Sequence, residues 1–207
     1  MHMSNTRKRL KLSDVADIRT GFTFREKIEE LPVGNAHIVQ IKDVRHIRDI
    51  TQSQQIYTNQ LPLIDWKGKA HLLIDSECVL LPCRGEYIKA HYFAGNQKES
   101  KALPLIVSSQ FLILTSNQHV LPEYLCWYLN QPIVQYELRQ IGQGSKIPML
   151  SVSMISKYEV EVPSLDIQQH IVALHRTWEQ EKRLTQQLIK NREQMMQGIF
   201  QQLLKGQ

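Results

Sequence analysis

Residues Gly144–Leu204 read GSKIPMLSVSMISKYEVEVPSLDIQQHIVALHRTWEQEKRLTQQLIKNREQMMQGIFQQLL, which predicts a polar loop, a short apolar strand and one long helix. Pro163 can end the strand, Ser164 is a good helix N-cap, and Asp166 places negative charge at the positive end of the helix dipole. Neither proline nor glycine occurs between Ser164 and Gly198. We therefore expect a helix of about 30–40 residues, roughly 50–60 Å long at 1.5 Å per residue.

Apolar side chains recur along this helix at alternating steps of four and three residues, which is the heptad pattern of a coiled coil. The same register brings Glu181, Thr185 and Arg192 onto the seam and interrupts it near its middle. The pattern favours pairing with another long helix, from a second copy or a partner, because polar seam residues can fix a register. An amphipathic helix lying across its own domain is the alternative. The expected pairing residues are Ile167, Ile171, Leu174, Trp178, Leu188, Met195 and Ile199, and Leu184, Met196, Phe200 and Leu203 form a second apolar edge.

The composition of the 207 residues, with 42% hydrophobic and 22% charged, is typical of a soluble globular protein. No apolar run approaches the ~20 residues of a membrane span, and the N-terminus lacks the features of a secretory signal, so we expect a cytoplasmic protein that does not use a membrane. The pattern of elements predicts an α+β fold. We expect a globular domain over residues 1–163 and the long helix over residues 164–207.

The sequence carries no motif that points to catalysis or to a bound metal or cofactor. It contains no GxxxxGK[ST] phosphate loop, no GxGxxG, no HExxH, no GxSxG and no Cys/His spacing for a metal. Cys78, Cys83 and Cys126 lie in hydrophobic contexts, and we interpret them as reduced core residues. We expect no enzyme, although catalytic residues scattered through the sequence are an open alternative.

The net charge of +5 is unevenly distributed. Residues 1–12 hold four positive and no negative charges, whereas residues 13–163 hold fifteen positive against sixteen negative charges. If the globular part binds nucleic acid, its cations must gather on one face, because affinity for DNA depends on local neutralisation of phosphates.

The globular part shows helix and strand signals in alternation. The expected helices are a short one over Leu12–Ile18 with a possible Ser13 cap, one opened by Pro122 over Glu123–Asn130, and one over Ile133–Leu138. The expected strands are His37–Ile41, an alternating charged strand over Lys42–Asp49, Leu72–Cys83 around a turn at Asp75–Glu77, Leu105–Val107 and Gln110–Leu114. Gly68 predicts a turn at Trp66–Lys69.

Several short sequence motifs follow one another in a recognisable order. They are Lys11–Ile18 followed by Gly21, Ile41–Val44, Leu80-Leu81 with Arg84-Gly85, Leu121–Leu125, a loop with Gly144-Ser145, and Val162–Leu165 with Gln168-Gln169 and Ile171-Val172. Their order and spacing resemble the DNA specificity subunits of type I restriction-modification systems. The resemblance covers nearly the whole chain.

The resemblance implies a DNA-reading target recognition domain followed by a spacer helix. Members of the family usually carry two such units in one chain, whereas this chain has one and shows no internal repeat. Two copies could pair their helices antiparallel and read a symmetric bipartite site. By the resemblance, catalysis belongs to partners: a methyltransferase subunit, which uses S-adenosylmethionine, and a motor-nuclease subunit.

The mixture of cations, glycine and aromatics over Arg84–Tyr92 suits contacts to phosphates and base edges. Each basic stretch could equally be a solvated surface. The residues expected to contact double-stranded DNA are Arg84, Lys89, Ser145 and Lys146, followed by Lys42, Arg45, Lys67 and Lys69. Two further functions stay open: a specificity-like adaptor of another defence or modification system, and a scaffold that pairs helices without binding DNA.

Overall fold

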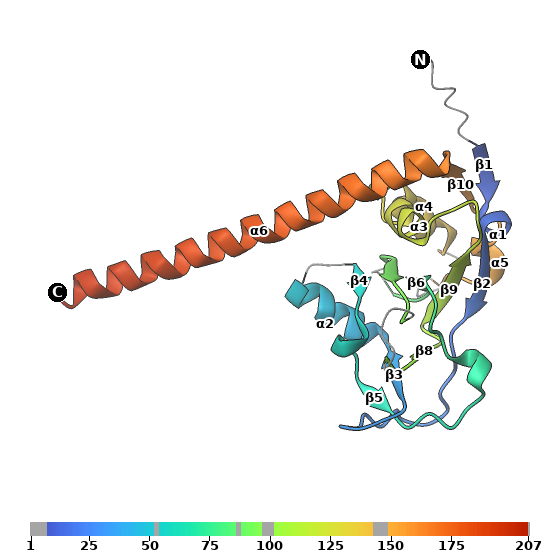
Figure 1. The fold of residues 1–207 in the computed structure, drawn as a ribbon, viewed down its shortest axis with the longest axis horizontal. Helices are drawn as coiled ribbons and strands as arrows, with labels where there is room; N and C mark the ends of the chain where they lie inside the picture. The colour runs from blue at the N-terminus through green and yellow to red at the C-terminus, as the bar shows by residue number, and fades with distance from the viewer. Residues whose placement is uncertain (1–7, 52–53, 86–87, 97–101, 143–148, 207) are drawn as a thin grey trace, which may run out of the picture. The chain divides into compact units, whose positions relative to one another are not determined.

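The computed structural model describes residues 8–51, 54–85, 88–96, 102–142 and 149–206. The chain divides into two compact units, Met1–Val172 and Ala173–Gln207. Its elements, shown in Figure 1, are β1 (Lys8–Lys11), α1 (Leu12–Val15), β2 (Ala16–Thr20), β3 (Ala36–Val39), α2 (Ile41–Thr51), β4 (Gln55–Ile56), η1 (Thr58–Gln60), β5 (Leu63–Ile64), η2 (Ala70–Leu72), β6 (Cys78–Pro82), β7 (His91–Phe93), β8 (Leu105–Val107), β9 (Phe111–Ser116), α3 (Pro122–Leu129), α4 (Pro132–Ile141), α5 (Val152–Ile155), β10 (Glu159–Val162) and α6 (Leu165–Leu204). The chain mixes helices with sheets and ends in one long helix, which confirms the predicted α+β class.

The centre of the first unit is a five-stranded sheet in the order β2-β9-β6-β7-β4. Strands β6 and β9 pair antiparallel and each has a second neighbour, so neither lies at an edge. All five residues of β6 are buried, as are Phe111–Leu114 of β9. Such continuous apolar runs are typical of strands covered on both faces.

The two faces of this sheet support two separate clusters of buried side chains. Successive residues of a strand point to opposite faces. Val79 and Leu81 accordingly join a cluster with residues of α3 and α4, whereas Cys78 and Leu80 join a cluster with residues of α2. Helix α2 therefore covers the face of the sheet opposite to α3 and α4.

Two smaller sheets complete the first unit. Strands β5, β3 and β8 form one, and β1 pairs antiparallel with β10 to form the other. Strand β10 leads directly into α6, which begins at Leu165 after Ser164 and runs for 40 residues. The predicted strand before the helix and the predicted helix are both confirmed. Gln168 and Val172 of α6 are buried within the first unit.

One prediction for the element after β3 is wrong. The alternating charges of Lys42–Asp49 indicated a strand, but the segment belongs to helix α2. Val44 and Ile47 are buried and Ile41 packs against the same cluster, so apolar positions three residues apart share one helix face. The Asp43 side chain also accepts a hydrogen bond from the Gln40 backbone N–H at 2.8 Å, which fits a helix start.

Two further boundaries differ from the predictions. The helix expected over Leu12–Ile18 ends at Val15, because Ala16–Thr20 pairs with β9. The N-cap of this helix is Lys11 and not Ser13, whose backbone N–H donates to the Ser156 carbonyl. In the expected strand Leu72–Cys83, Ala70–Leu72 form a 3-10 turn and Ile74 makes only an isolated bridge with Leu105. Regular pairing begins at Cys78.

The strand expected over His37–Ile41 is present but ends at Val39, because Ile41 begins α2. Other local predictions agree with the structure. Pro122 is the first residue of α3, and α4 covers the second expected helix. Cys78, Cys83 and Cys126 are free and buried, as expected of core thiols. No described helix is long and apolar enough to span a membrane.

Candidate nucleic-acid interface

Arg84 lies at the exit of β6, held by backbone contacts on both sides. The Cys83 N–H donates to the Gln110 carbonyl at 2.9 Å, and the Leu150 N–H donates to the Cys83 carbonyl at 2.9 Å. Arg84 itself forms an isolated bridge with Met149. These contacts hold the Arg84 backbone in place while its side chain is exposed.

Arg45 of helix α2 reaches the same place from a distant part of the sequence. Gly85, the residue after Arg84, has a φ of +95°, and a Cβ added there would lie 4.0 Å from Nη2 of Arg45. Arg45 is exposed as well. The fold thus brings the Arg45 guanidinium beside the residue that follows Arg84.

Neither arginine has an ion pair or side-chain hydrogen bond within the part of the chain that the structure describes. Each guanidinium therefore keeps its positive charge available to an anion or a hydrogen-bond acceptor outside the chain. A phosphate or the acceptor edge of a guanine would supply the missing negative partner. We call Arg45, Arg84 and Gly85 the arginine site.

Gln110 joins the two elements of the arginine site, a role that the sequence did not predict. Its backbone carbonyl receives the Cys83 N–H, and its side-chain Oε1 accepts from the Ile41 N–H at 3.0 Å. One residue therefore fixes both the exit of β6 and the first turn of α2. The available signal was a polar residue at the start of the apolar run Phe111–Leu114.

Lys42 and Lys89 are engaged with other groups of the chain. The Lys42 ammonium pairs with Glu30, and this hydrogen bond raises the pKa of Lys42. Lys89 is half-buried and its Nζ donates to the Asn130 carbonyl at 3.3 Å. DNA contact by either lysine would have to compete with these bonds, unlike contact by Arg45 and Arg84.

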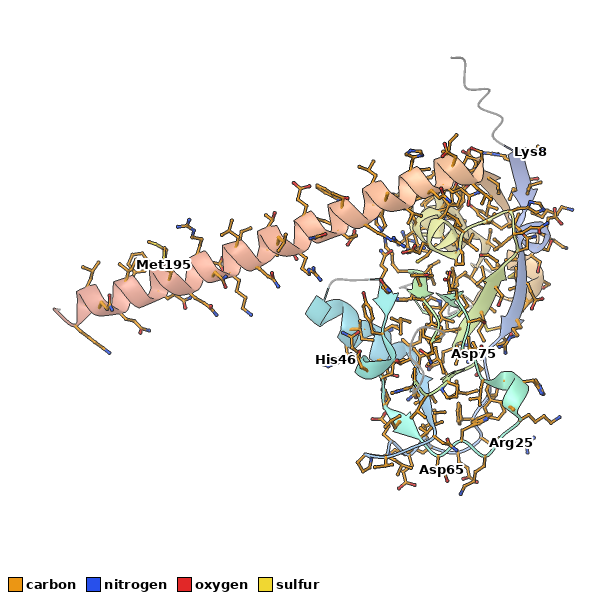
Figure 2. The ribbon with its side chains drawn as sticks, in the orientation of Figure 1. Lys8, Arg25, His46, Asp65, Asp75 and Met195 are labelled. Atoms are coloured by element: carbon orange, nitrogen blue, oxygen red, sulfur yellow. The ribbon has the colours of Figure 1, made fainter. Side chains whose placement is uncertain are left out.

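Lys67 and Lys69 belong to a different region of the first unit. Lys67 pairs with Asp65 at 3.2 Å, and Lys67 and Asp65 line an open groove of about 970 Å³. Phe22 and Trp66 also line this groove. These two rings meet edge to face at 5.0 Å between centroids. Figure 2 shows Asp65 and Arg25, both on this groove, away from His46 of α2. The eight predicted contacts are therefore not gathered in one patch.

Ser145 and Lys146 lie outside the described residues, but the ends of their loop are described. The Met149 N–H donates to the Gly142 carbonyl at 3.3 Å, and Met149 bridges Arg84. Gly142 and Met149, the described residues before and after this segment, are therefore joined to each other, and Met149 is paired with Arg84.

The predicted pairing residues of α6 differ in their surroundings. Ile171 is half-buried and packs against the core of the first unit, and Ile167 is half-buried too. In the second unit, by contrast, Leu174 is 73% exposed and Trp178 is 53% exposed. The other exposed seam residues are Leu188, Met195 and Ile199. The apolar seam residues after Val172 are thus exposed within the part of the chain that the structure describes.

The described residues include no group of three or more His, Cys, Asp or Glu side chains arranged to hold a metal ion. Burial raises the pKa of Asp43, near the arginine site, and the hydrogen bond from Gln40 opposes that rise. The role of the Asp43 carboxylate is to cap the N-terminus of α2.

The family model described as type I restriction modification DNA specificity domain matches residues 6–192. No curated protein sequence matches the chain. Among solved structures, one from work on complex assembly and conformational transition of the type I R-M system is similar with a TM-score of 0.68 and 12% identity, over 96% of this chain and 45% of the other. The HsdS subunit from Thermoanaerobacter tengcongensis is similar with a TM-score of 0.59 and 14% identity, over 89% and 40%. The S subunit of a type I restriction-modification system from M. genitalium is similar with a TM-score of 0.56 and 11% identity, over 93% and 44%. The chain thus spans less than half the length of each structure, and at these identities the likeness concerns the fold.

Proposed function

This chain belongs to the type I restriction-modification DNA specificity family, and on that premise we propose that it is a non-catalytic subunit that binds double-stranded DNA sequence-specifically. Its role is to direct a methyltransferase subunit and a motor-nuclease subunit to their site. S-adenosylmethionine would then be bound by the methyltransferase. The first 163 residues act as the target recognition domain, and residues 164–207 act as the spacer and dimerisation helix.

The arginine site is the observation that carries the DNA-reading part of this proposal. Arg45 and Arg84 come from separate elements, are exposed, and have no anionic partner within the described residues. Arg84 sits on a backbone fixed by two hydrogen bonds at Cys83. An arginine whose backbone is fixed can present two parallel N–H groups of its side chain to a guanine, and we assign Arg84 that base contact. Arg45 is assigned a phosphate contact that sets orientation.

The remaining predicted cations have supporting roles in the proposal. Lys146 and Ser145 are assigned contacts to the DNA backbone; the support is that they precede Met149 in the chain, and Met149 bridges Arg84. Lys42, Lys89, Lys67 and Lys69 add phosphate contacts where the DNA extends past the arginine site. Lys67 has to exchange Asp65 for a phosphate to do so.

Two copies pair through the exposed seam of α6, and the homodimer reads two half-sites related by two-fold symmetry. Support comes from Leu174, Trp178 and Leu188, which are more than half exposed. A row of large apolar side chains in water is unfavourable, at roughly 25 cal/mol per Å² of apolar area, and pairing removes that cost. The methyltransferase docks on helix faces outside this seam.

The experiment compares the full chain with a version that ends at Val172, after the buried residues of α6. Mass is measured by light scattering during size-exclusion chromatography, and the same fractions then select from a randomised DNA pool at several salt concentrations. We expect a dimer that enriches a two-fold-symmetric interrupted site and a shortened monomer that does not. A dimer without any sequence enrichment would contradict DNA reading and favour a helix-pairing scaffold. Methyltransferase that fails to copurify with a DNA-selective dimer would favour an adaptor of another system.

A further inference from the structure

We propose that two copies of α6 pair antiparallel in a single register, in which Glu181 of each copy lies opposite Arg192 of the other. This inference rests on the proposed homodimer and adds the register that holds it. The evidence for the register is the row of seam residues in the second unit, where α6 continues without a break to Leu204.

In an antiparallel pair, residue numbers rise along one helix while they fall along the other, so the numbers of two residues at the same height have a constant sum. The seam residues of this helix fall on alternating a and d heptad positions, so one alignment brings every a position of the free seam level with a d position of the second copy. The layers of this alignment are Leu174 with Ile199, Trp178 with Met195, Glu181 with Arg192, and Thr185 with Leu188, each occurring twice by symmetry.

This alignment uses only the part of the seam that its own chain leaves uncovered. Leu174 and Ile199 form the outermost layer, and both are exposed. Ile171, one seam position earlier, packs against the core of the first unit instead. The first unit therefore sets where the paired part of the seam begins.

The two charged seam residues have no counter-ion in the described part of the chain. Glu181 and Arg192 are eleven residues apart, about 17 Å along the helix, which is too far for an intrachain pair. Among the described residues neither makes an ion pair. Lys182, the nearest cation to Glu181 in sequence, is held by Glu179 at 2.5 Å and lies 5.9 Å from the Trp178 ring centroid. Arg192 of a second copy is the complementary partner on the seam.

Other alignments lack this complementarity. Sliding one helix by a heptad places Arg192 opposite Leu174, and sliding it the other way places Glu181 opposite Ile199. A parallel, in-register pair sets Glu181 against Glu181 and Arg192 against Arg192. Each of these alternatives puts a charge on the seam against an apolar side chain or a like charge, which is unfavourable when water is displaced. Electrostatics thus select the antiparallel register.

The first test reverses the charges in the full-length chain. We expect Glu181→Arg and Arg192→Glu each to weaken dimerisation at least about tenfold, measured by analytical ultracentrifugation over a concentration series, because two attractive pairs become repulsive. The double variant restores the dimer, and a mixture of the two single variants forms the heterodimer. Matched controls are Glu193→Arg and Arg183→Glu, which make the same charge changes off the seam. Far-UV circular dichroism verifies that every variant stays helical.

The second test is covalent. Leu174→Cys mixed with Ile199→Cys should form an intermolecular disulfide under mild oxidation, whereas neither variant cross-links alone, because like positions lie about 37 Å apart in this register. The three native cysteines are buried and do not compete. Cross-linking of either variant alone, or a dimer unaffected by the reversals, would overturn the register while leaving DNA recognition intact. A monomer at every concentration would overturn the register and the homodimer together, and a dimer with this register that selects no DNA would contradict only the proposed function.

Discussion

The guanidinium of Arg45 on α2 lies beside Gly85, the residue that follows Arg84 at the exit of β6. Forty residues separate Arg45 from Gly85 in the chain, and Gln110 holds the two segments together through its carbonyl and its side-chain oxygen. Exposed arginines without a carboxylate partner among the described residues leave their positive charge available to a polyanion. This relationship gives the DNA-binding proposal its sharpest tests.

Arg84→Ala and Arg45→Ala should affect DNA binding differently. Loss of a bidentate guanine contact at Arg84 should relax discrimination at one base pair of each half-site by about 1–3 kcal/mol. Loss of a phosphate contact at Arg45 should weaken binding to all sequences and lower the salt dependence by about one phosphate per half-site. Binding to a set of single-base variants at several salt concentrations measures both quantities. Lys157→Ala, an equal loss of charge on an exposed lysine, is the control; equal effects on every sequence from Arg84→Ala would contradict base reading.

Two glycine substitutions should change stability in opposite directions. Gly85 has a positive φ, so Gly85→Ala should cost about 1–2 kcal/mol through backbone strain, and it should also disturb DNA selectivity. Gly198 lies inside α6 with no other atom near its Cβ position, so Gly198→Ala should stabilise that helix by about 0.5–1 kcal/mol. Chemical denaturation followed by circular dichroism measures both. A neutral Gly85→Ala variant would show that the turn relaxes without strain.

Gln168→Ala should strongly destabilise the attachment of α6 to the first unit. The side chain is fully buried; Oε1 accepts from the Leu121 N–H at 2.9 Å, and Nε2 donates to the carbonyls of His119 and Pro163 at 3.0 and 2.9 Å. Its removal leaves three part-buried backbone groups without these partners, which costs about 1–3 kcal/mol. Urea denaturation gives the value, with exposed Gln169→Ala as the matched control. A loss below that of the control would contradict the role assigned to these bonds.

The thiol of Cys78 should resist alkylation in the folded protein. Burial raises the pKa of Cys78 from 9.0 to about 12, with a small opposing effect of Arg19. At pH 9 the folded state would hold about 500-fold less thiolate at Cys78 than the unfolded state. Between pH 9 and 12 the unfolded chain releases this proton first, so the thiol's contribution to stability falls as pH rises. Iodoacetamide labelling at pH 9, with and without denaturant and read by mass spectrometry, measures the difference; equal labelling rates at Cys78 would contradict it.

Local sequence signals were sufficient for the elements whose causes are local. Ser164, Pro163 and the absence of breakers up to Gly198 determine where α6 begins and that it is long, and its heptad spacing determines the seam. The fully apolar runs of β6 and β9 likewise predict strands in the centre of a sheet. The seam charges from which we propose a pairing register can also be read from the sequence, because helix geometry converts residue number into height along the axis.

Tertiary structure alone decided the features that depend on contacts between distant segments. The segment after Gln40 alternates charges as an exposed strand would, yet Val44 and Ile47 are buried against the sheet and make it helix α2. Only the packed fold brings Arg45 to Gly85, because their approach depends on α2 packing against one face of the sheet that contains β6 and β9. Burial of Gln168 has the same origin, since its partners Leu121 and His119 lie more than forty residues away in the chain. Periodicity and capping are set by neighbours in sequence, whereas packing partners are set by the whole fold.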